Sequence, residues 1–204
     1  MNRERPLLIA GLVITVLLVG LGAVAGVAAA DGVTSWTYTV DGTEQTATYE
    51  GAGTAADPFI IDSIVDLQAI NQNATTRGYH YRLGTDIDAG ATRNWDAGAG
   101  FVPITTFTGS FDGAGREVVD LHIDADERVP KHLRNAVGLF GKVGSGGRIT
   151  GLHLENANVE GGNDVGALVG DNQGTIAGSS ATGNVTGQNR VGGLVGDNQG
   201  TIAG

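Results

Sequence analysis

The sequence predicts an all-β protein: a right-handed parallel β-helix with an N-terminal hairpin and a short capping helix, preceded by a signal or anchor helix. Two observations support this fold class. The chain of 204 residues contains 35 glycines, well above the roughly 7% of an average protein, so the backbone makes many tight turns. Similar units of about 26 to 28 residues also begin at Asn135, Asn163 and Asn189, and a repeat of this length is typical of stacked architectures.

The N-terminal segment, residues 1–30, predicts export. Arg3 and Arg5 precede an uninterrupted apolar or small run, residues 7–30, that ends in three alanines. These are the features of a signal peptide cleaved after Ala30. The run is also long enough to span a bilayer, so an uncleaved anchor is the alternative. Either way we expect an extracytoplasmic protein, secreted or at the cell surface, with a membrane contact only through residues 7–30 if they are uncleaved.

Charge and composition exclude several classes of function. The chain carries 22 acidic and 12 basic residues, a net charge of −10, whereas nucleic acid binding needs a basic surface. Only Lys131 and Lys142 are lysines, and this acidic, lysine-poor composition favours a halophilic protein. Cysteine is absent, so neither disulfides nor thiolate chemistry contribute.

A hairpin and a short helix are predicted after the export segment. Alternating β-formers in residues 36–49 flank Asp41-Gly42, a pair that favours the primed turns of hairpins. The helix is expected to begin behind Ser63, with Asp66 three positions later as in a capping box. Its buried face would hold four apolar residues at helical spacing: Ile64, Leu67, Ile70 and Ala74.

Short β runs separated by Gly, Asp and Asn occupy the rest of the chain, and no further helix is predicted. Residues 112–115, Asp-Gly-Ala-Gly, are interpreted as a turn after Phe111. We therefore divide the chain into four parts: a signal or anchor (1–30), a hairpin and linker (31–60), a helical cap with the first coils (61–134) and the repeats (135–204), of which the last is incomplete.

The last two repeat units, which start at Asn163 and Asn189, are nearly identical. Each contains the decapeptide VGDNQGTIAG, and residues 163–178 differ from residues 189–204 only at Asp164/Arg190 and Ala167/Gly193. Equivalent residues of stacked coils lie about 4.8 Å apart. The third unit stops at Gly204, before its last strand, which predicts an open sheet edge.

Stacking would place Asp171 against Asp197, and like charges in this arrangement repel each other. Either concentrated salt or a bridging cation would make the pair tolerable, because salt of about 1 M screens charges over only about 3 Å. We favour salt screening, and we expect the domain to lose stability as salt is removed.

Several segments resemble GLUG-motif proteins, which are exported surface proteins of bacteria and archaea. These are PFIIDSIVDLQAI, YRLGTDID, FVPITTFTGSFDGAGREVVDLHI and VGLFGKVGSGGRITGLHLENANVEG, followed by two VGxLVGDNQGTIAG units, and together they cover about residues 51–204. Thr105 stands where the family has Gly, which leaves the bend of that corner open. The resemblance implies a right-handed β-helix with an N-terminal helical cap, and it implies little about activity.

Some GLUG relatives are peptidases that use an HExxH zinc motif, and this motif is missing here, so the activity does not carry over. The four histidines stand alone in the sequence and are interpreted as polar residues of the surface or of strand edges: His80, His122, His132 and His153.

Two pairs of acids are each separated by one residue, Asp86/Asp88 and Asp124/Asp126, and on a strand each pair shares one face. Such pairs could bind calcium or act as acid and base on a sugar, although solvated strand-end acids are the plainer interpretation. The candidate metal ligands are Asp86, Asp88, Asp171 and Asp197, with calcium as the one cofactor considered and no catalytic residue assigned. Asn73 and Asn184 begin N-glycosylation tripeptides.

These observations favour a non-enzymatic cell-surface β-solenoid module that serves adhesion, a stalk or the envelope as part of a longer protein. One alternative is a carbohydrate-active β-helix enzyme, a lyase or glycosidase with acids from Asp86, Asp88 or Asp112. Another is a carbohydrate- or cation-binding module. The expected partners are carbohydrates or proteins of the cell envelope.

Overall fold

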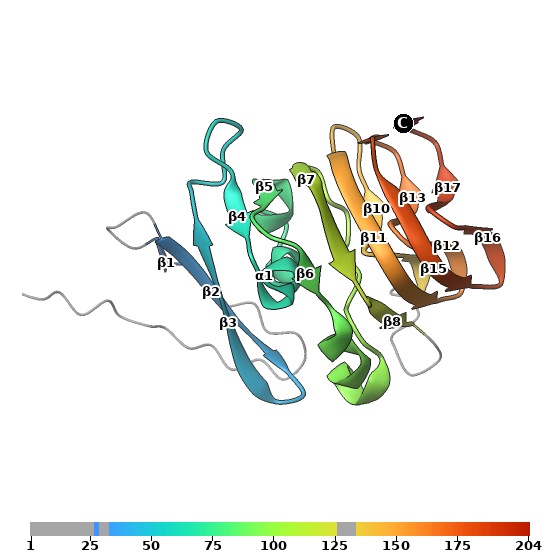
Figure 1. Ribbon diagram of the computed structural model, residues 1–204, viewed down its shortest axis with the longest axis horizontal. Helices are drawn as coiled ribbons and strands as arrows, with labels where there is room; N and C mark the ends of the chain where they lie inside the picture. Colours follow the sequence, from blue (N-terminus) through green and yellow to red (C-terminus); the bar gives the residue numbers. More distant parts are fainter. Residues whose placement is uncertain (1–26, 29–32, 126–133) are drawn as a thin grey trace, which may run out of the picture.

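The computed structural model describes residues 27–28, 33–125 and 134–204. The described chain is mostly β, with few helical segments, and its strands form one antiparallel sheet and three parallel sheets (Figure 1). The antiparallel sheet lies at one end of the molecule and consists of β1 (Val27–Ala28), β2 (Val33–Val40) and β3 (Thr43–Glu50). The strands of the repeats lie at the other end.

The predicted hairpin is present. β2 and β3 pair antiparallel along their whole length, and Asp41 and Gly42 connect them with φ values of 51° and 73°. Both values are positive, as a type I′ turn requires. Val27 and Ala28 pair with β2, whereas the rest of the predicted signal or anchor, including Ala30, lies outside the described residues. Within the described part of the chain, no helix is long and apolar enough to cross a membrane.

The predicted helix is present but shorter than expected. α1 (Ile64–Ala69) begins at its N-cap Ser63, whose hydroxyl accepts a hydrogen bond from the Asp66 amide at 3.1 Å. The 3-10 turns η1 (Ile70–Gln72) and η2 (Thr76–Gly78) follow. Placing Ala74 on the buried face was wrong, because it is exposed. The Asn73 side chain accepts hydrogen bonds from the amides of Thr75 and Thr76, and so offers the backbone an alternative to the helix.

Aromatic side chains join the hairpin to the rest of the core. Trp36 lies 4.5 Å from Tyr49 and 5.3 Å from Phe59, measured between ring centroids. The Tyr49 hydroxyl donates to the backbone carbonyl of Asp66 at 2.5 Å, so the hairpin also holds α1. Burial raises the pKa of Tyr49 well above its usual value, since the charged phenolate would lose its solvent.

A nine-stranded parallel sheet runs through the molecule and faces the viewer in Figure 1. Its strands are β4 (Phe59–Ile61), β5 (His80–Leu83), β6 (Ile87–Asp88), β7 (Ser110–Val119), β8 (His122–Asp124), β11 (Arg148–Glu160), β14 (Thr175–Ala177), β15 (Ser180–Thr186) and β18 (Thr201–Ala203).

Two features of this region differ from the sequence prediction. The 3-10 segment η3 (Gly90–Gly98) was not expected, because its residues show no helical pattern of apolar side chains. Residues 112–115 do not end a strand but bend β7 in its middle, where Ala114 and Gly115 have φ values of 54° and 71°. The register with β11 shifts at the same point. β7 therefore changes direction at this bend.

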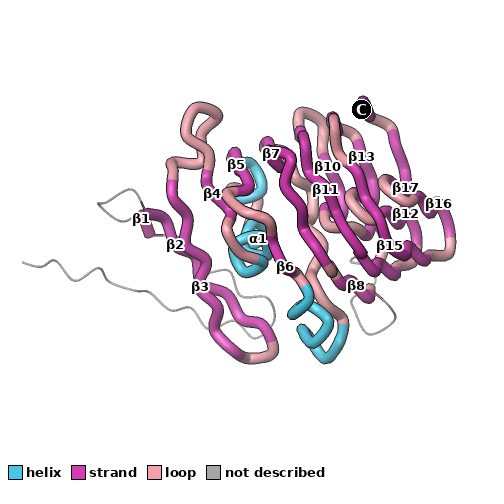
Figure 2. The backbone as a smooth tube through the Cα atoms, in the orientation of Figure 1, coloured by secondary structure: helices cyan, strands magenta, loops and turns pink. Residues whose placement is uncertain are grey.

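Two three-stranded parallel sheets complete the repeat region (Figure 2). One contains β9 (Asn135–Val137), β12 (Asn163–Gly166) and β16 (Asn189–Gly192), and the other contains β10 (Phe140–Val143), β13 (Val169–Asn172) and β17 (Val195–Asn198). Each unit contributes strands to both of these sheets and to the nine-stranded sheet. The chain thus passes through the same three sheets once in each repeat and then returns to the first of them.

Candidate functional site

The repeat units stack in the register that the sequence predicts. Val169 pairs with Val195 and Ile176 with Ile202. Val169 and Ile176 are buried in the core, whereas 45% of Ile202 is exposed. Neighbouring units therefore share an apolar interface made by residues one period apart.

Asparagine side chains run between the units as two ladders. In the first, Asn163 donates to Asn135 at 2.7 Å and Asn189 donates to Asn163 at 2.6 Å. In the second, the buried Asn172 donates to the Asn198 side chain at 2.7 Å and accepts from the Gly174 amide at 3.1 Å. Each unit thus binds the next through amide groups as well as through apolar contacts.

Asp171 and Asp197 lie opposite each other as expected, but they are not two isolated charges. Lys142 occupies the equivalent position of the preceding unit, and its ammonium group lies 2.7 Å from the Asp171 carboxylate. On the other side, the Arg190 guanidinium lies 4.0 Å from Asp197. Two cations therefore lie close to these carboxylates and offset part of the repulsion expected from the sequence.

Asp164 and Arg190, which occupy equivalent positions in their units, form an ion pair across the interface. The hydrogen bond and the charge of Asp164 raise the pKa of Arg190 above its usual value. Sequence reasoning missed this pair. A signal was available, because this position is one of only two that differ between the otherwise identical units. We call Lys142, Asp164, Asp171, Arg190 and Asp197 the charge ladder.

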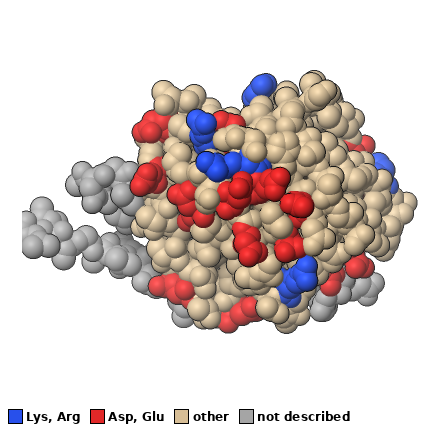
Figure 3. Space-filling model, in the orientation of Figure 1, with Lys and Arg blue, Asp and Glu red and all other residues tan. Residues whose placement is uncertain are grey.

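The acids considered for catalysis are held by local contacts on the nine-stranded sheet. Asp86 accepts from the Glu117 amide at 3.0 Å and Asp88 from the Gly90 amide at 2.8 Å. Asp112 accepts from the Ala114 amide at 2.9 Å and forms an exposed ion pair with Arg82. Acidic groups gather over the middle of this face (Figure 3). Asp88 and Asp112 thus each stabilise a turn, and Asp86 links the residues before β6 to β7.

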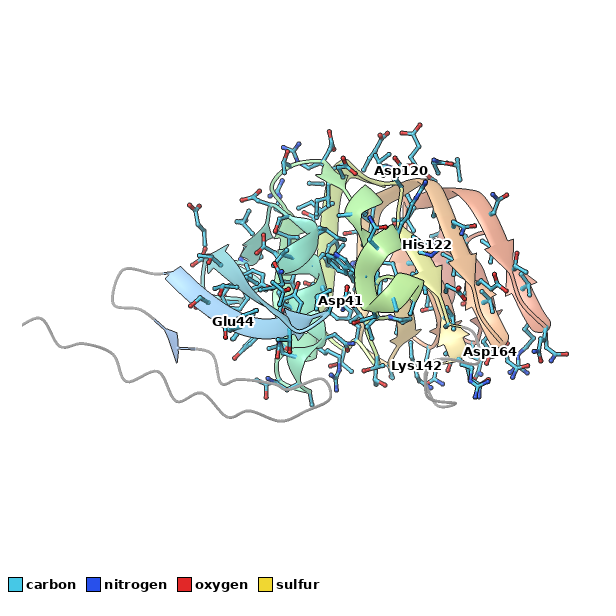
Figure 4. The ribbon with its side chains drawn as sticks, turned by 90° about the horizontal axis from the view of Figure 1, so that it is seen from below. Asp41, Glu44, Asp120, His122, Lys142 and Asp164 are labelled. Atoms are coloured by element: carbon cyan, nitrogen blue, oxygen red, sulfur yellow. The ribbon has the colours of Figure 1, made fainter. Side chains whose placement is uncertain are left out.

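The four candidate metal ligands form two separate pairs and not one group. Asp86 and Asp88 flank Ile87 in the nine-stranded sheet, whereas Asp171 and Asp197 belong to the sheet of β13 and β17. Among the described residues, no group of three or more His, Cys, Asp or Glu side chains could hold a metal ion. The two sheets face different sides of the molecule. In Figure 4, Lys142 and Asp164 of the charge ladder lie on one side, whereas Asp120, which follows β7 of the nine-stranded sheet, lies on the other. Asp126 lies outside the described residues.

The described histidines take part in polar contacts between strands. His80 lies 2.6 Å from the Ser110 hydroxyl, and His153 lies 2.8 Å from the Ser180 hydroxyl. His122 contacts the carbonyl oxygen of Gly98 at 3.2 Å. His132 and Lys131 lie outside the described residues.

The two glycosylation tripeptides differ in conformation. Asn73 begins a turn in which its own side-chain oxygen accepts from the Thr75 amide at 2.8 Å. Asn184 is exposed in the middle of β15 and pairs with Asn158 of β11. Thr105 stands at the corner where the GLUG pattern has Gly. The side-chain oxygen of Asn71 accepts hydrogen bonds from the amide and from the hydroxyl of Thr105, both at 3.1 Å.

A cavity of about 640 Å³ lies beside the hairpin, and none of its lining residues is charged. The rings of Trp36 and Tyr79 are nearly parallel, at 7°, with centroids 6.3 Å apart. Phe59 stands at right angles to both, 5.3 Å from each. Polar atoms come from Asn73 and from threonines, and the complete lining is Thr34, Trp36, Ala52, Phe59, Asn73, Ala74, Thr75, Thr76 and Tyr79.

The chain is similar to a curated protein, Halomucin of Haloquadratum walsbyi (strain DSM 16790 / HBSQ001), with 48% identity over 158 residues. The match covers 73% of this chain and 2% of Halomucin. No family model matches, so the resemblance to GLUG-motif proteins is not confirmed, and no solved structure matches either. The chain therefore spans only a small part of Halomucin's length, and the similarity gives no specific function.

Proposed function

We propose that the chain is a non-enzymatic module of an exported cell-surface protein, with its stacked repeats serving as a stalk, an adhesin segment or an envelope component. The observation that carries the proposal is the stacking itself. Successive units repeat the same apolar contacts and asparagine ladders one period apart. Such an arrangement extends in one dimension by adding units, which suits a structural element.

The state of the acidic residues supports a role without catalysis. A catalytic pair needs two carboxylates that converge on one substrate, with space between them. Asp86, Asp88 and Asp112 each accept a hydrogen bond from a nearby backbone amide instead. We therefore prefer the structural role to a lyase or glycosidase.

We also propose that the repeats coil as a right-handed parallel β-helix. Parallel strands joined by a crossover within one sheet are right-handed in about 98% of cases. The parallel pairing of β11 with β14 and of β14 with β18 involves such connections. An experimental structure would test the handedness, and a left-handed coil would contradict this part of the proposal.

Exposure at the cell surface can be tested directly in a halophilic host. An epitope-tagged full chain is expressed, and intact cells are treated with a protease that cannot enter them. We expect the tag to be lost from intact cells or found in the medium, while a cytoplasmic control protein survives. Retention of the tag with the cytoplasmic control would contradict export.

The absence of catalysis has its own test. The purified chain is incubated with a panel of polysaccharides in concentrated salt, and reducing ends and unsaturated products are measured. We expect no turnover. Activity that disappears in Asp86→Asn and persists in the matched variant Asp57→Asn, an exposed acid outside the candidate group, would establish the enzyme instead.

The aromatic cavity favours a second candidate function, carbohydrate binding. Sugar rings pack on aromatic faces while amides and hydroxyls bind their hydroxyl groups, and uncharged linings suit neutral sugars. Tyr79 is the half-buried ring of the three. If this candidate is correct, an oligosaccharide found by array screening will bind at least about tenfold more weakly to Tyr79→Ala. Equal affinity in both proteins would exclude the cavity as the site.

A further inference from the structure

The tripeptide that begins at Asn73 lies in a turn between η1 and η2. Ala74 and Thr75 are exposed, and Asn73 is half-buried. The backbone hydrogen bonds of this turn are local, because the Asn73 carbonyl accepts from the Arg77 amide and the Thr75 carbonyl accepts from the Gly78 amide. An enzyme can therefore reach both the asparagine and the threonine without separating two strands.

The side chain of Asn73 has one engaged atom and one available atom. Its oxygen accepts hydrogen bonds from the amides of Thr75 and Thr76, at 2.8 and 3.1 Å. Its nitrogen donates no hydrogen bond to the part of the chain that the structure describes. N-glycosylation attaches a sugar to this nitrogen and leaves the oxygen as an acceptor. The modification is therefore compatible with the turn as it stands.

Asn184, which begins the other tripeptide, lies in the middle of β15. It pairs with Asn158 of β11, and Thr186 of the same tripeptide pairs with Glu160. The Thr186 carbonyl also accepts from the Gly161 amide at 3.0 Å. An enzyme that closes around these three residues would have to detach them from β11, which breaks strand hydrogen bonds. The structure therefore favours Asn73 over Asn184 as an acceptor of sugar.

Asn73 also lines the aromatic cavity, so a sugar attached to its nitrogen begins at the wall of this cavity. Tyr79 lines the same cavity, and its ring lies 5.3 Å from that of Phe59. The cavity volume of about 640 Å³ falls within the roughly 300 to 1,000 Å³ of pockets that hold small molecules. A neutral sugar ring on Asn73 thus has an uncharged aromatic surface within reach.

The walls of the cavity come from two parts of the chain. Thr34 and Trp36 belong to β2 of the hairpin, whereas Asn73 and Tyr79 belong to the turns that follow α1. A sugar that fills the cavity contacts both parts. It would therefore add to the aromatic contacts that already join the hairpin to the core.

We propose that Asn73 is N-glycosylated and that the first sugar of its glycan packs in the aromatic cavity against Tyr79. In the transfer, a bond forms between Asn73 Nδ2 and the anomeric carbon of the sugar, and the bond from that carbon to the phosphate of a lipid-linked donor breaks. The lipid phosphate leaves, and one amide proton passes to a base of the transferase.

This inference rests on the export proposed above, and it names the sugar that the cavity holds. The sugar is carried by the chain itself and is not a free oligosaccharide. Covalent attachment favours this occupant, because it gives the sugar a high effective concentration at the cavity.

The first test measures occupancy of the two tripeptides. The full chain is expressed in a halophilic host that performs N-glycosylation, and it is recovered from outside the cells. Cleavage before each aspartate separates the tripeptides into residues 66–85 and 171–196, which are analysed by mass spectrometry. We expect a glycan on Asn73 and at least about tenfold lower occupancy at Asn184.

Two variants at Thr75 define the acceptor. Thr75→Ala should abolish the glycan on Asn73, whereas Thr75→Ser should retain it, because the tripeptide still ends in a hydroxyl residue. Thr75 is exposed, so the fold should tolerate both changes. An exported chain without a glycan on Asn73 would overturn the inference and leave the proposed function intact. Equal occupancy at Asn184 would overturn the preference for the turn. A chain that stays in the cytoplasm without a glycan would contradict both proposals.

The second test asks whether the glycan lies in the cavity. Thr75→Ala is combined with Tyr79→Ala, and melting temperatures are measured in concentrated salt. Loss of the glycan should lower the melting temperature of the parent by about 2 °C or more, and it should have little effect in the Tyr79→Ala background. The control background is Trp95→Ala, because Trp95 is also half-buried but packs on Phe101 outside the cavity.

Equal effects of Thr75→Ala in the parent, Tyr79→Ala and Trp95→Ala backgrounds would overturn the placement of the sugar in the cavity. A free oligosaccharide provides an independent check. We expect it to bind Thr75→Ala at least about tenfold more tightly than the glycosylated chain, whose cavity is filled. Equal binding to both proteins would show that the cavity is open to free sugars, and it would also overturn the placement.

Discussion

The two copies of VGDNQGTIAG, residues 169–178 and 195–204, have one sequence and one strand pattern but different surroundings. Ile176 is 1% exposed in the first copy, whereas Ile202 is 45% exposed in the second. The first copy is covered on both sides, by β10 and β11 on one side and by β17 and β18 on the other. An identical sequence thus gives an identical local structure, while burial depends on which layers lie next to it.

This comparison shows where the stability of a stacked fold resides. Truncation of a side chain that contacts two layers lowers the free energy of unfolding more than truncation of the same side chain where it contacts one layer. Apolar contacts and side-chain hydrogen bonds both cross the interface between units. The same substitution at two equivalent positions therefore measures how much one neighbouring layer contributes to the free energy of unfolding, because the side chain is the same in both.

The largest difference is expected at the isoleucines. Ile176→Ala should lower the free energy of unfolding by about 2 to 5 kcal/mol, because it leaves a cavity between two layers. Ile202→Ala should cost less than about 1 kcal/mol, since its side chain is already half exposed. Urea denaturation at constant high salt measures both. Equal losses would mean that the two copies have the same surroundings in solution, which would break the comparison.

The asparagines should show a smaller difference in the same direction. Asn172→Ala removes the bond to Asn198 and leaves the Gly174 amide without its acceptor, which costs about 1 to 3 kcal/mol. Asn198→Ala should cost about half as much, because the Asn198 side chain is exposed to water. Thermal melting of the two variants side by side checks the order. A larger loss in Asn198→Ala would contradict the buried ladder.

The dependence of the melting temperature on salt should separate the effect of the charge ladder from that of the overall negative charge. We expect the melting temperature of the parent to fall as salt is removed, because the net charge of −10 is no longer screened. Lys142→Met removes the cation next to Asp171 and should make this fall steeper, by about 1 kcal/mol at low salt. The control Lys142→Arg keeps the charge. Parallel melting curves for the parent and Lys142→Met at all salt concentrations would show that the ion pair does not offset the Asp171–Asp197 repulsion.

The smallest expected effect is a gain at Gly193, the second position at which the two units differ. A Cβ at Gly193 would meet no atom within 4 Å, and the equivalent residue Ala167 is buried. Gly193→Ala should therefore stabilise the fold by about 0.5 kcal/mol, because it reduces the entropy of the unfolded chain. Gly196→Ala is the matched control, since its Cβ would lie 2.4 Å from the Asp164 carbonyl carbon. A lower stability of Gly193→Ala would show that the surroundings of Gly193 leave no room for a methyl group.

The sequence by itself determined the local elements and the register of the repeats. The hairpin turn at Asp41-Gly42 and the capping of α1 by Ser63 depend on residues close to each other in the chain. The pairing of Val169 with Val195 follows from a period that sequence comparison reveals directly. Backbone preferences and periodicity act over short distances or repeat regularly, so both can be predicted from the sequence.

Only the tertiary structure decided which equivalent residues are buried and which charges pair. Ile176 is buried whereas Ile202 is half exposed, and Lys142 reaches Asp171 from a unit whose sequence differs from the others. The sequence predicted two opposed carboxylates, and the structure placed a cation beside each of them. The physical reason is that burial and charge pairing are properties of contacts between repeat units, and these contacts exist only after the units have stacked.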